Sequence, residues 1–155
     1  MQYCISSASG LSLVLWRFFD FITESGENLI AAWYEAQDPD VQAQFDATLL
    51  FLRATHDWEY PRIDEFKALT GRNQGLGELR FDVRVNRHGS RNPVKRRFRP
   101  VGIWPPVSPN SFILILGCEK SGRGTYVPHC AFDIAMRHKA DFENREGAIH
   151  EHPVG

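Results

Sequence analysis

The segment that most constrains the fold runs from Gly75 to Trp104 and reads GLGELRFDVRVNRHGSRNPVKRRFRPVGIW. Its first part alternates apolar and charged residues, in the order Leu79, Arg80, Phe81, Asp82, Val83, Arg84 and Val85. Its second part, from Val94, places basic residues on one parity, namely Lys95, Arg97 and Arg99. Because successive side chains of a strand point to opposite faces, both parts predict half-buried strands, joined by the turn-forming run 86–93. The segment thus predicts a β-hairpin with one apolar and one basic face, in which a bulge or a strand end accommodates Arg96 on the apolar parity.

Positive charge is concentrated in this part of the chain. Residues 62–99 hold 11 Lys and Arg against 4 Asp and Glu, a net charge of +7, whereas residues 1–61 carry −7 and residues 100–155 carry −1. A basic face of this kind indicates a polyanionic partner, most commonly nucleic acid. The alternative is a solvated hairpin whose long charged side chains have no partner.

The composition is that of a globular chain with a core of its own. With 155 residues, of which 43% are hydrophobic, we expect one domain over residues 1–155 with loose termini at 1–10 and 144–155. The three cysteines are odd in number and include no CxxC pair, so we expect no disulfide framework, no metal and a cytoplasmic location. The longest apolar run, residues 10–22, is far shorter than the roughly 20 residues that cross a bilayer, so no membrane association is expected.

The spacing of apolar residues and the positions of capping and turn-forming residues predict the elements around the hairpin. In chain order they are a buried strand over residues 11–22, a helix capped by Ser25 that runs to about residue 37, a second helix from Asp38 to about Thr55, an anchored loop and helical turn over 57–71, a central strand over 111–116, a polar loop over 117–128 and a closing helix over 129–143. Asp38-Pro39 is typical of a helix start, and an apolar stripe of Val41, Phe45, Leu49 and Leu52 follows it. The two helices are expected to form a helical hairpin.

This order predicts an α+β fold. An N-terminal strand and the helical hairpin precede a three-stranded antiparallel meander that completes a small sheet, and a C-terminal helix closes the domain. The helices are expected to cover one face of that sheet.

Three pieces of sequence then resemble a known family, the RelE/ParE superfamily of bacterial toxins, and in particular its HigB-like, phage-related branch. Residues 66–71 (FKALTG) followed by 75–81 (GLGELRF) are similar to the family's K-x-L and L-x-E-L-R motifs before and within its second strand. Residues 96–99 (RRFR) resemble the start of its third strand. Residues 112–142 resemble its central strand, basic loop and closing helix, so the likeness covers about residues 11–143.

The resemblance implies a toxin of a type II toxin–antitoxin system that cleaves mRNA on the ribosome without a metal or other cofactor. The 2′-hydroxyl of RNA attacks its own 3′-phosphate, cations stabilise the charge that develops on phosphorus, and another group moves the proton. A cognate antitoxin, a small helix-turn-helix protein with an acidic segment, would mask the basic face.

The resemblance also assigns roles to residues of this chain. Arg97 and Arg80 match the family's strand arginines, Lys120 matches its basic loop, and Tyr126 or His129 would handle the proton or stack on a base. RNA binding falls to the further cations Lys95, Arg99, Arg84 and Arg123. Each assignment has a plainer alternative: Arg80 and Arg97 in salt bridges with Glu78 or Asp82, the basic loop as a solvated turn, and His129 as the first residue of a helix.

The chain also departs from the family pattern. Leu76 and Glu78 stand where RelE itself has lysines, and Arg96 replaces a tyrosine. These departures favour the HigB-like branch, and they leave open a second hypothesis from another functional class. On that hypothesis the protein is a non-catalytic inhibitory or binding module on the same fold, comparable to the gyrase-directed members of the superfamily.

Overall fold

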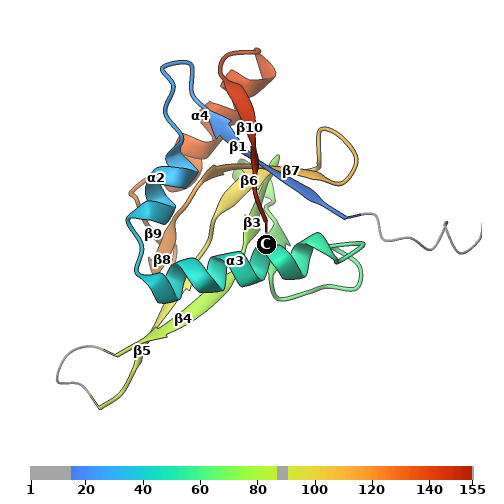
Figure 1. Ribbon diagram of the computed structural model, residues 1–155. Coiled ribbons are helices and arrows are strands. Elements are labelled where there is room, and N and C mark those ends of the chain that lie inside the picture. The colour runs from blue at the N-terminus through green and yellow to red at the C-terminus, as the bar shows by residue number, and fades with distance from the viewer. Residues whose placement is uncertain (1–14, 87–90, 155) are drawn as a thin grey trace, which may run out of the picture.

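The structure, a computed structural model, describes residues 15–86 and 91–154, and these form three α-helices and ten strands in two sheets (Figure 1). The α+β class is therefore confirmed. The loose N-terminus predicted over residues 1–10, the first residues of the predicted strand at 11–14 and the centre of the hairpin turn at 87–90 lie outside the described residues.

The larger sheet has six strands in the order β10-β1-β7-β6-β3-β2. In chain order these are β1 (Arg17–Ile22), β2 (Phe66–Ala68), β3 (Leu76–Leu79), β6 (Val101–Ile103), β7 (Ser111–Leu116) and β10 (Ala148–His152). β1 runs parallel to β7, and the other neighbouring pairs are antiparallel. All six residues of β7 are buried, which confirms the central strand predicted from its uninterrupted apolar run.

The smaller sheet has four antiparallel strands in the order β4-β5-β8-β9. They are β4 (Phe81–Val85), β5 (Val94–Phe98), β8 (Glu119–Gly122) and β9 (Thr125–Val127). The predicted hairpin is present here, with Phe81 opposite Phe98 and Val85 opposite Val94. Buried and exposed residues alternate along it as predicted. Phe81 and Phe98 are buried, and the next pair, Asp82 and Arg97, is exposed.

The hairpin differs from the prediction in the length of its strands. Each strand is interrupted, at Arg80 and at Arg99-Pro100, and beyond the interruption the chain continues in the larger sheet as β3 and β6. Pro100 has no N–H to donate to a ladder, while its carbonyl accepts a hydrogen bond from the Leu79 amide at 2.7 Å. The two sheets are therefore joined at these interruptions, and one hairpin contributes to both.

Helices cover both faces of the larger sheet, not one face as predicted. The helices are α2 (Leu29–Glu35), α3 (Pro39–Arg53) and α4 (Ala131–Glu143). Phe112 and Leu114 of β7 share a core with the apolar stripe of α3, whereas Ile113 and Ile115 share a second core with Ala131 and Ala135 of α4. Because side chains alternate along β7, α3 packs against one face of the strand and α4 packs against the other.

The helical hairpin forms with a shorter first helix than predicted. Asn28, not Ser25, caps α2, because the Asn28 Oδ1 atom accepts a hydrogen bond from the Ala31 amide at 2.9 Å. Ser25 instead lies in the preceding turn, with its hydroxyl 3.0 Å from that of Thr23. α3 begins at Pro39 after Asp38 as predicted, and its apolar stripe is buried.

Three predictions of irregular structure are wrong. The turn expected over residues 57–71 contains β2, the polar loop at 117–128 is the β8–β9 hairpin, and the C-terminal tail contains β10. β10 pairs with the outer edge of β1, where the His152 Nδ1 atom lies 2.8 Å from Oδ1 of the buried Asp20. These strands are three to five residues long, so the edges that they complete stabilise them more than their own residue pattern does.

A stack of three tryptophans packs between the N-terminal strand region and the loop after α3. The rings of Trp16 and Trp58 lie 4.0 Å apart, and those of Trp58 and Trp104 lie 5.5 Å apart, both nearly parallel. The Trp58 indole N–H also donates to the Leu52 carbonyl at 3.1 Å. This stack anchors the loop after α3 through Trp58, whereas Tyr60 projects into solvent with 78% of its surface exposed.

Candidate nucleic-acid interface

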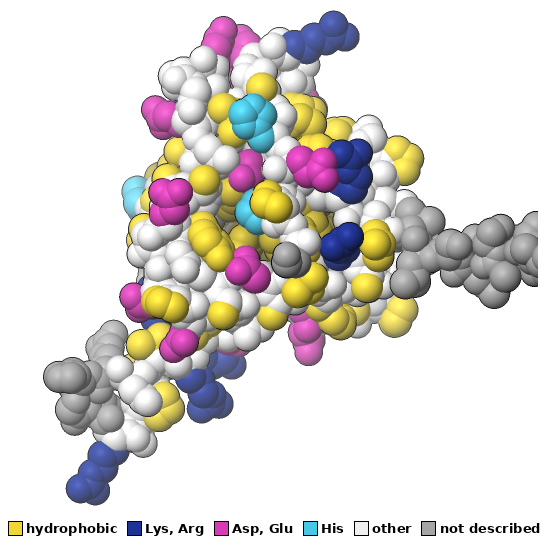
Figure 2. All heavy atoms as spheres, viewed as in Figure 1, with side chains coloured by type: hydrophobic (Ala, Val, Ile, Leu, Met, Phe, Trp, Pro, Cys, Tyr) yellow, Lys and Arg dark blue, Asp and Glu magenta, His cyan; other side chains and the backbone are white. Residues whose placement is uncertain are grey.

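A cleft of about 620 Å³ lies where α3, the loop before β2 and the smaller sheet meet. Five of the predicted site residues line it, namely Arg80, Lys95, Arg97, Arg99 and Lys120. They come from the interruptions of the hairpin, from β5 and from β8, so residues distant in sequence converge on one surface. On the face shown in Figure 2, dark blue Lys and Arg side chains lie along the β4–β5 hairpin at the lower left.

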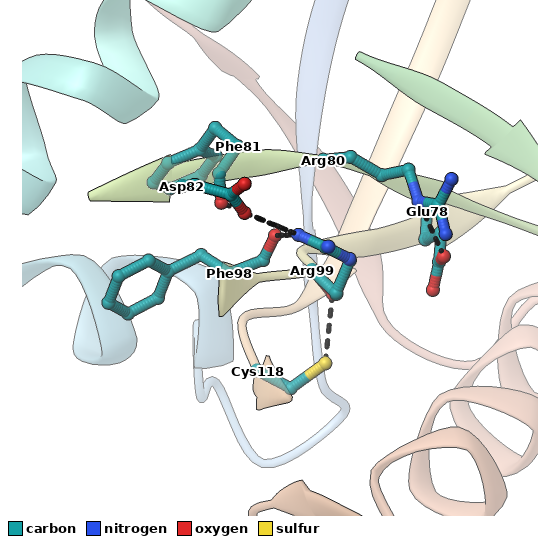
Figure 3. A network of polar contacts seen from close by, with 7 residues as sticks. All are labelled: Glu78, Arg80, Phe81, Asp82, Phe98, Arg99 and Cys118. Atoms are coloured by element: carbon teal, nitrogen blue, oxygen red, sulfur yellow. Dashed lines mark hydrogen bonds and ion pairs between the residues drawn. The ribbon is translucent and has the colours of Figure 1, made fainter. Parts of the chain in front are cut away.

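Arg99 is a buried structural cation and not the exposed residue that alternation predicted. Only 8% of its surface is exposed, because β5 ends at Phe98 and the alternation ends with it. Its Nη1 atom donates to the Phe98 carbonyl at 2.7 Å and lies 3.5 Å from Oδ1 of Asp82 (Figure 3). Its Nε atom has no hydrogen-bond partner among the described residues. Arg99 therefore adds positive potential beneath the cleft, while the Nη1 atom of its guanidinium is bound to the protein.

Arg80 forms the salt bridge that the plainer alternative predicted. Its Nε atom donates to Oε1 of Glu78 at 3.1 Å (Figure 3). Glu78 is 3% exposed, and its Oε2 atom has no partner in the part of the chain that the structure describes. Burial raises the pKa of Glu78, and the nearby cations, Arg80 first among them, oppose that rise without cancelling it. Glu78 thus fixes the Arg80 side chain at the edge of the cleft.

Asp82 neutralises a third cation. Its Oδ2 atom lies 3.2 Å from the ammonium nitrogen of Lys95, so one carboxylate serves both Lys95 and Arg99. Arg96, whose parity was irregular, forms a two-point contact with Glu119 of β8, at 2.6 and 2.9 Å. β5 has no bulge at Arg96. The Arg96 side chain lies half-buried on the otherwise apolar face of the strand, where it forms its ion pair with Glu119.

Arg97 and Lys120 differ from these paired cations. They lie directly opposite each other on β5 and β8, and neither side chain forms a hydrogen bond or an ion pair with any residue in 15–86 or 91–154. Like charges directly opposite each other destabilise a sheet. An anion held between them would relieve this repulsion, and guanidinium and ammonium groups are the cations that hold phosphate in proteins.

The remaining predicted residues lie outside this cleft. Tyr126 and His129 line a separate cleft of about 510 Å³ beside the start of α4, where the Tyr126 ring packs against Phe132 with centroids 4.5 Å apart. Burial is the main cause of the raised pKa of Tyr126. Arg123 is exposed in the turn between β8 and β9, and Arg84 is exposed on β4 opposite Lys95. Of the two proton-handling candidates, Tyr126 is the β9 partner of Lys120 and is near enough to Arg99 and Arg80 for them to influence its pKa, whereas His129 has no such contact with the strand cations in the described structure.

The cleft also contains residues that sequence reasoning missed. Phe51 of α3 lines it with 47% of its surface exposed, and Asp64 and Glu65 bring carboxylates from the loop before β2. Phe51 lies outside the apolar stripe of α3, between Leu49 and Leu52, so the helical periodicity already indicated an aromatic ring without a place in the core. No pattern marked the two carboxylates, because only the tertiary fold brings their loop to the hairpin.

Cys118 lies where the two sheets join at Arg99, and its thiol is unreactive. Its thiol donates to the Arg99 carbonyl at 2.8 Å, and burial raises the pKa of Cys118 to about 12. Such a thiol stays protonated at neutral pH and is a poor nucleophile. The cysteine therefore fixes the backbone at Arg99.

Among the described residues, no three or more His, Cys, Asp or Glu side chains are arranged to hold a metal ion. None of the helices in the described ranges has the length and apolar character needed to span a bilayer.

The buried Glu78 carboxylate should make the stability of the protein depend on pH. Because its folded pKa lies above the unfolded value of 4.5, the folded state binds more protons between the two values. The free energy of unfolding should therefore fall as the pH rises from about 4.5 through the folded pKa. Glu78→Gln should remove this decline, and at pH 7 its stability relative to wild type should be higher than at pH 4.5. Urea unfolding across pH 4 to 8 measures the difference, with Glu35→Gln on the exposed surface of α2 as the control; parallel pH profiles for wild type and Glu78→Gln would contradict it.

Comparison with known proteins identifies no relative: no protein-family model matches the chain, and no curated protein or solved structure is significantly similar to it.

Proposed function

We propose that the protein binds single-stranded RNA in the basic cleft and cleaves it, as the toxin of a type II toxin–antitoxin system. The observation that carries the proposal is the unpaired Arg97 and Lys120 pair, which lies in register on two strands in a cleft with three further cations. The arrangement of β1 parallel to β7, beside an antiparallel β3-β6-β7 meander, is consistent with the RelE-like fold expected from the sequence.

The proposed reaction needs phosphate binding and two proton transfers. The 2′-oxygen loses its proton and bonds to the adjacent phosphorus, while the bond from phosphorus to the 5′-oxygen breaks and that oxygen takes up a proton. The products are a 2′,3′-cyclic phosphate and a free 5′-hydroxyl. Arg97 and Lys120 would stabilise the extra negative charge on the phosphoryl oxygens.

Proton transfer in this cleft can also involve carboxylates that the sequence did not suggest. Asp64 and Glu65 line the cleft, and their carboxylates form no hydrogen bond or ion pair with the described residues. Either can accept the proton of the 2′-hydroxyl, and Lys120 can return one to the 5′-oxygen. His129 lines a different cleft, so we give it no part in the reaction proposed here, whereas Tyr126, the β9 partner of Lys120, remains a candidate for proton transfer.

The partners follow from the same surface. Translated mRNA and the ribosome would be the targets, which implies a cytoplasmic location. A helix-turn-helix antitoxin with an acidic segment would block the cleft by occupying the cations that bind phosphate.

One observation favours the second candidate, a non-catalytic binding module. No histidine or tyrosine among the described residues lines the cleft, and three of its five cations already have carboxylate partners. Such a surface can hold an acidic segment of another protein without any chemistry.

Cleavage products distinguish the two candidates. Purified protein is incubated with translating ribosomes, and the 5′ ends of the mRNA are mapped. A nuclease leaves new ends that carry a 5′-hydroxyl, and its induced expression arrests growth, whereas an Arg97→Ala/Lys120→Ala variant is harmless. Inhibited growth without new RNA ends would establish the binding module in place of the nuclease.

A further inference from the structure

A second cleft adjoins the basic cleft. It has a volume of about 560 Å³ and lies along the loop from Trp58 to Asp64 and along β2. Asp64 and Arg80 line both clefts, so the two are continuous at the point where the hairpin passes from one sheet to the other. A linear ligand can therefore extend from one into the other.

Each cleft presents one aromatic ring to solvent. Phe51 in the first is 47% exposed, and Tyr60 in the second is 78% exposed. The Tyr60 backbone is held in place because the Asp57 Oδ1 atom accepts hydrogen bonds from the amides of Glu59 and Tyr60, at 2.8 and 3.0 Å. An exposed ring on an anchored backbone is a surface on which a flat group can stack, and an aromatic side chain has few rotatable bonds to order when it does so.

Cations are interleaved with these rings. The second cleft adds Arg62 and Lys67, both exposed, to those of the first. Together the clefts contain seven cations and four carboxylates, a net charge of +3 on a chain whose total charge is −1. One of the carboxylates, Glu59, accepts a hydrogen bond from the Trp104 indole at 3.1 Å. Alternating cations and aromatic rings are the arrangement with which proteins bind single-stranded nucleic acid.

We infer that Phe51 and Tyr60 are base-stacking residues, which hold two bases of a single-stranded RNA on either side of the Arg80 junction. This inference rests on the proposed function and specifies its ligand: an unpaired strand of several nucleotides, with phosphates on Arg97 and Lys120 and bases on the two rings. Duplex RNA does not fit, because its bases are stacked on each other and not free to meet a side chain.

Binding measurements with matched ligands test the stacking residues. Fluorescence anisotropy is used with a ten-nucleotide RNA, with an abasic ribose-phosphate chain of the same length and charge, and with an RNA duplex. Stacking contributes about 1–3 kcal/mol for each base. Phe51→Ala and Tyr60→Ala should therefore each weaken binding of the ten-nucleotide RNA by about 5- to 150-fold, and change binding of the abasic chain less than about twofold.

Conservative and distant variants serve as controls. Phe51→Tyr and Tyr60→Phe keep the rings and should bind as wild type does, and Leu50→Ala removes an exposed apolar residue of α3 outside both clefts. If the alanine variants bind the ten-nucleotide RNA unchanged, or lose affinity equally for the abasic chain, the stacking inference is wrong although the proposed function stands. A wild-type protein that binds none of these RNAs refutes the proposed function as well.

Discussion

Arg97→Ala/Lys120→Ala is expected to lose at least about 100-fold in affinity for single-stranded RNA. Hydrogen bonds from charged groups contribute about 1.5–3 kcal/mol each, and neither side chain has to break a hydrogen bond or ion pair with a described residue in order to bind phosphate. The dependence of log K on log salt should also become shallower by about 1.4, because each phosphate contact on a single strand contributes about 0.7. Anisotropy titrations between about 50 and 200 mM salt measure both quantities.

The matched control removes the same net charge elsewhere. Arg17 of β1 and Arg137 of α4 are exposed and line neither cleft, so Arg17→Ala/Arg137→Ala should change the affinity only a few-fold. Equal losses in the two double variants would mean that binding depends on total charge and not on the cleft. Removal of Arg97 and Lys120 relieves their cross-strand repulsion but also removes the attraction of Arg97 to Asp82 opposite it and of Lys120 to Glu78, so the free energy of unfolding should change little.

The parts of the fold that the sequence predicted are those with a strong local signal. The stripe of α3 after Asp38-Pro39, the apolar run of β7 and the alternation of the β4–β5 hairpin each fix an element from its own residues. β2, β8, β9 and β10 could not be predicted in this way, because strands of three to five residues depend on the partner that hydrogen-bonds to them. β10 in particular forms where β1 offers a free edge and Asp20 offers a partner to His152.

The sequence likewise predicted only part of the candidate site. Counting charge along the hairpin located four of the five cations of the cleft, and the resemblance to a basic loop added Lys120, but neither distinguished paired from unpaired cations. That distinction depends on Glu78 and Asp82, whose positions follow from the interruption of the strands at Arg80 and Arg99. Alternation within a strand says nothing about where the strand breaks, and so Arg99 was expected outside and lies inside.

The break in the hairpin also explains why an acidic residue at position 78 is compatible with a basic cleft. Glu78 does not face the cleft as a competing anion, because its carboxylate is buried beneath Arg80. The charge that reaches solvent is that of the arginine. Leu76, two residues earlier, is fully buried in the second core of the larger sheet and has no surface to offer a ligand.

Trp58→Ala should be the most destabilising single substitution proposed for this protein, with a loss of about 3–5 kcal/mol in the free energy of unfolding. Trp58 is 1% exposed, and its removal opens a cavity between Trp16 and Trp104 and leaves the Leu52 carbonyl without its indole donor. For a chain of this size the loss corresponds to a fall of roughly 10 °C in Tm. Urea unfolding and calorimetry measure the two quantities.

Two variants of the same loop separate packing from ligand contact. Trp58→Phe keeps a ring in the stack and loses the indole N–H, so it should cost less than half as much as Trp58→Ala. Tyr60→Ala removes an aromatic ring two residues further on that is almost wholly exposed, and it should leave stability within about 0.5 kcal/mol of wild type while weakening RNA binding. If Trp58→Ala unfolds at the same urea concentration as Tyr60→Ala, the tryptophan stack does not anchor the loop. Tyr60 would then have no rigid support in the second cleft, because Trp58 and Tyr60 belong to the same loop.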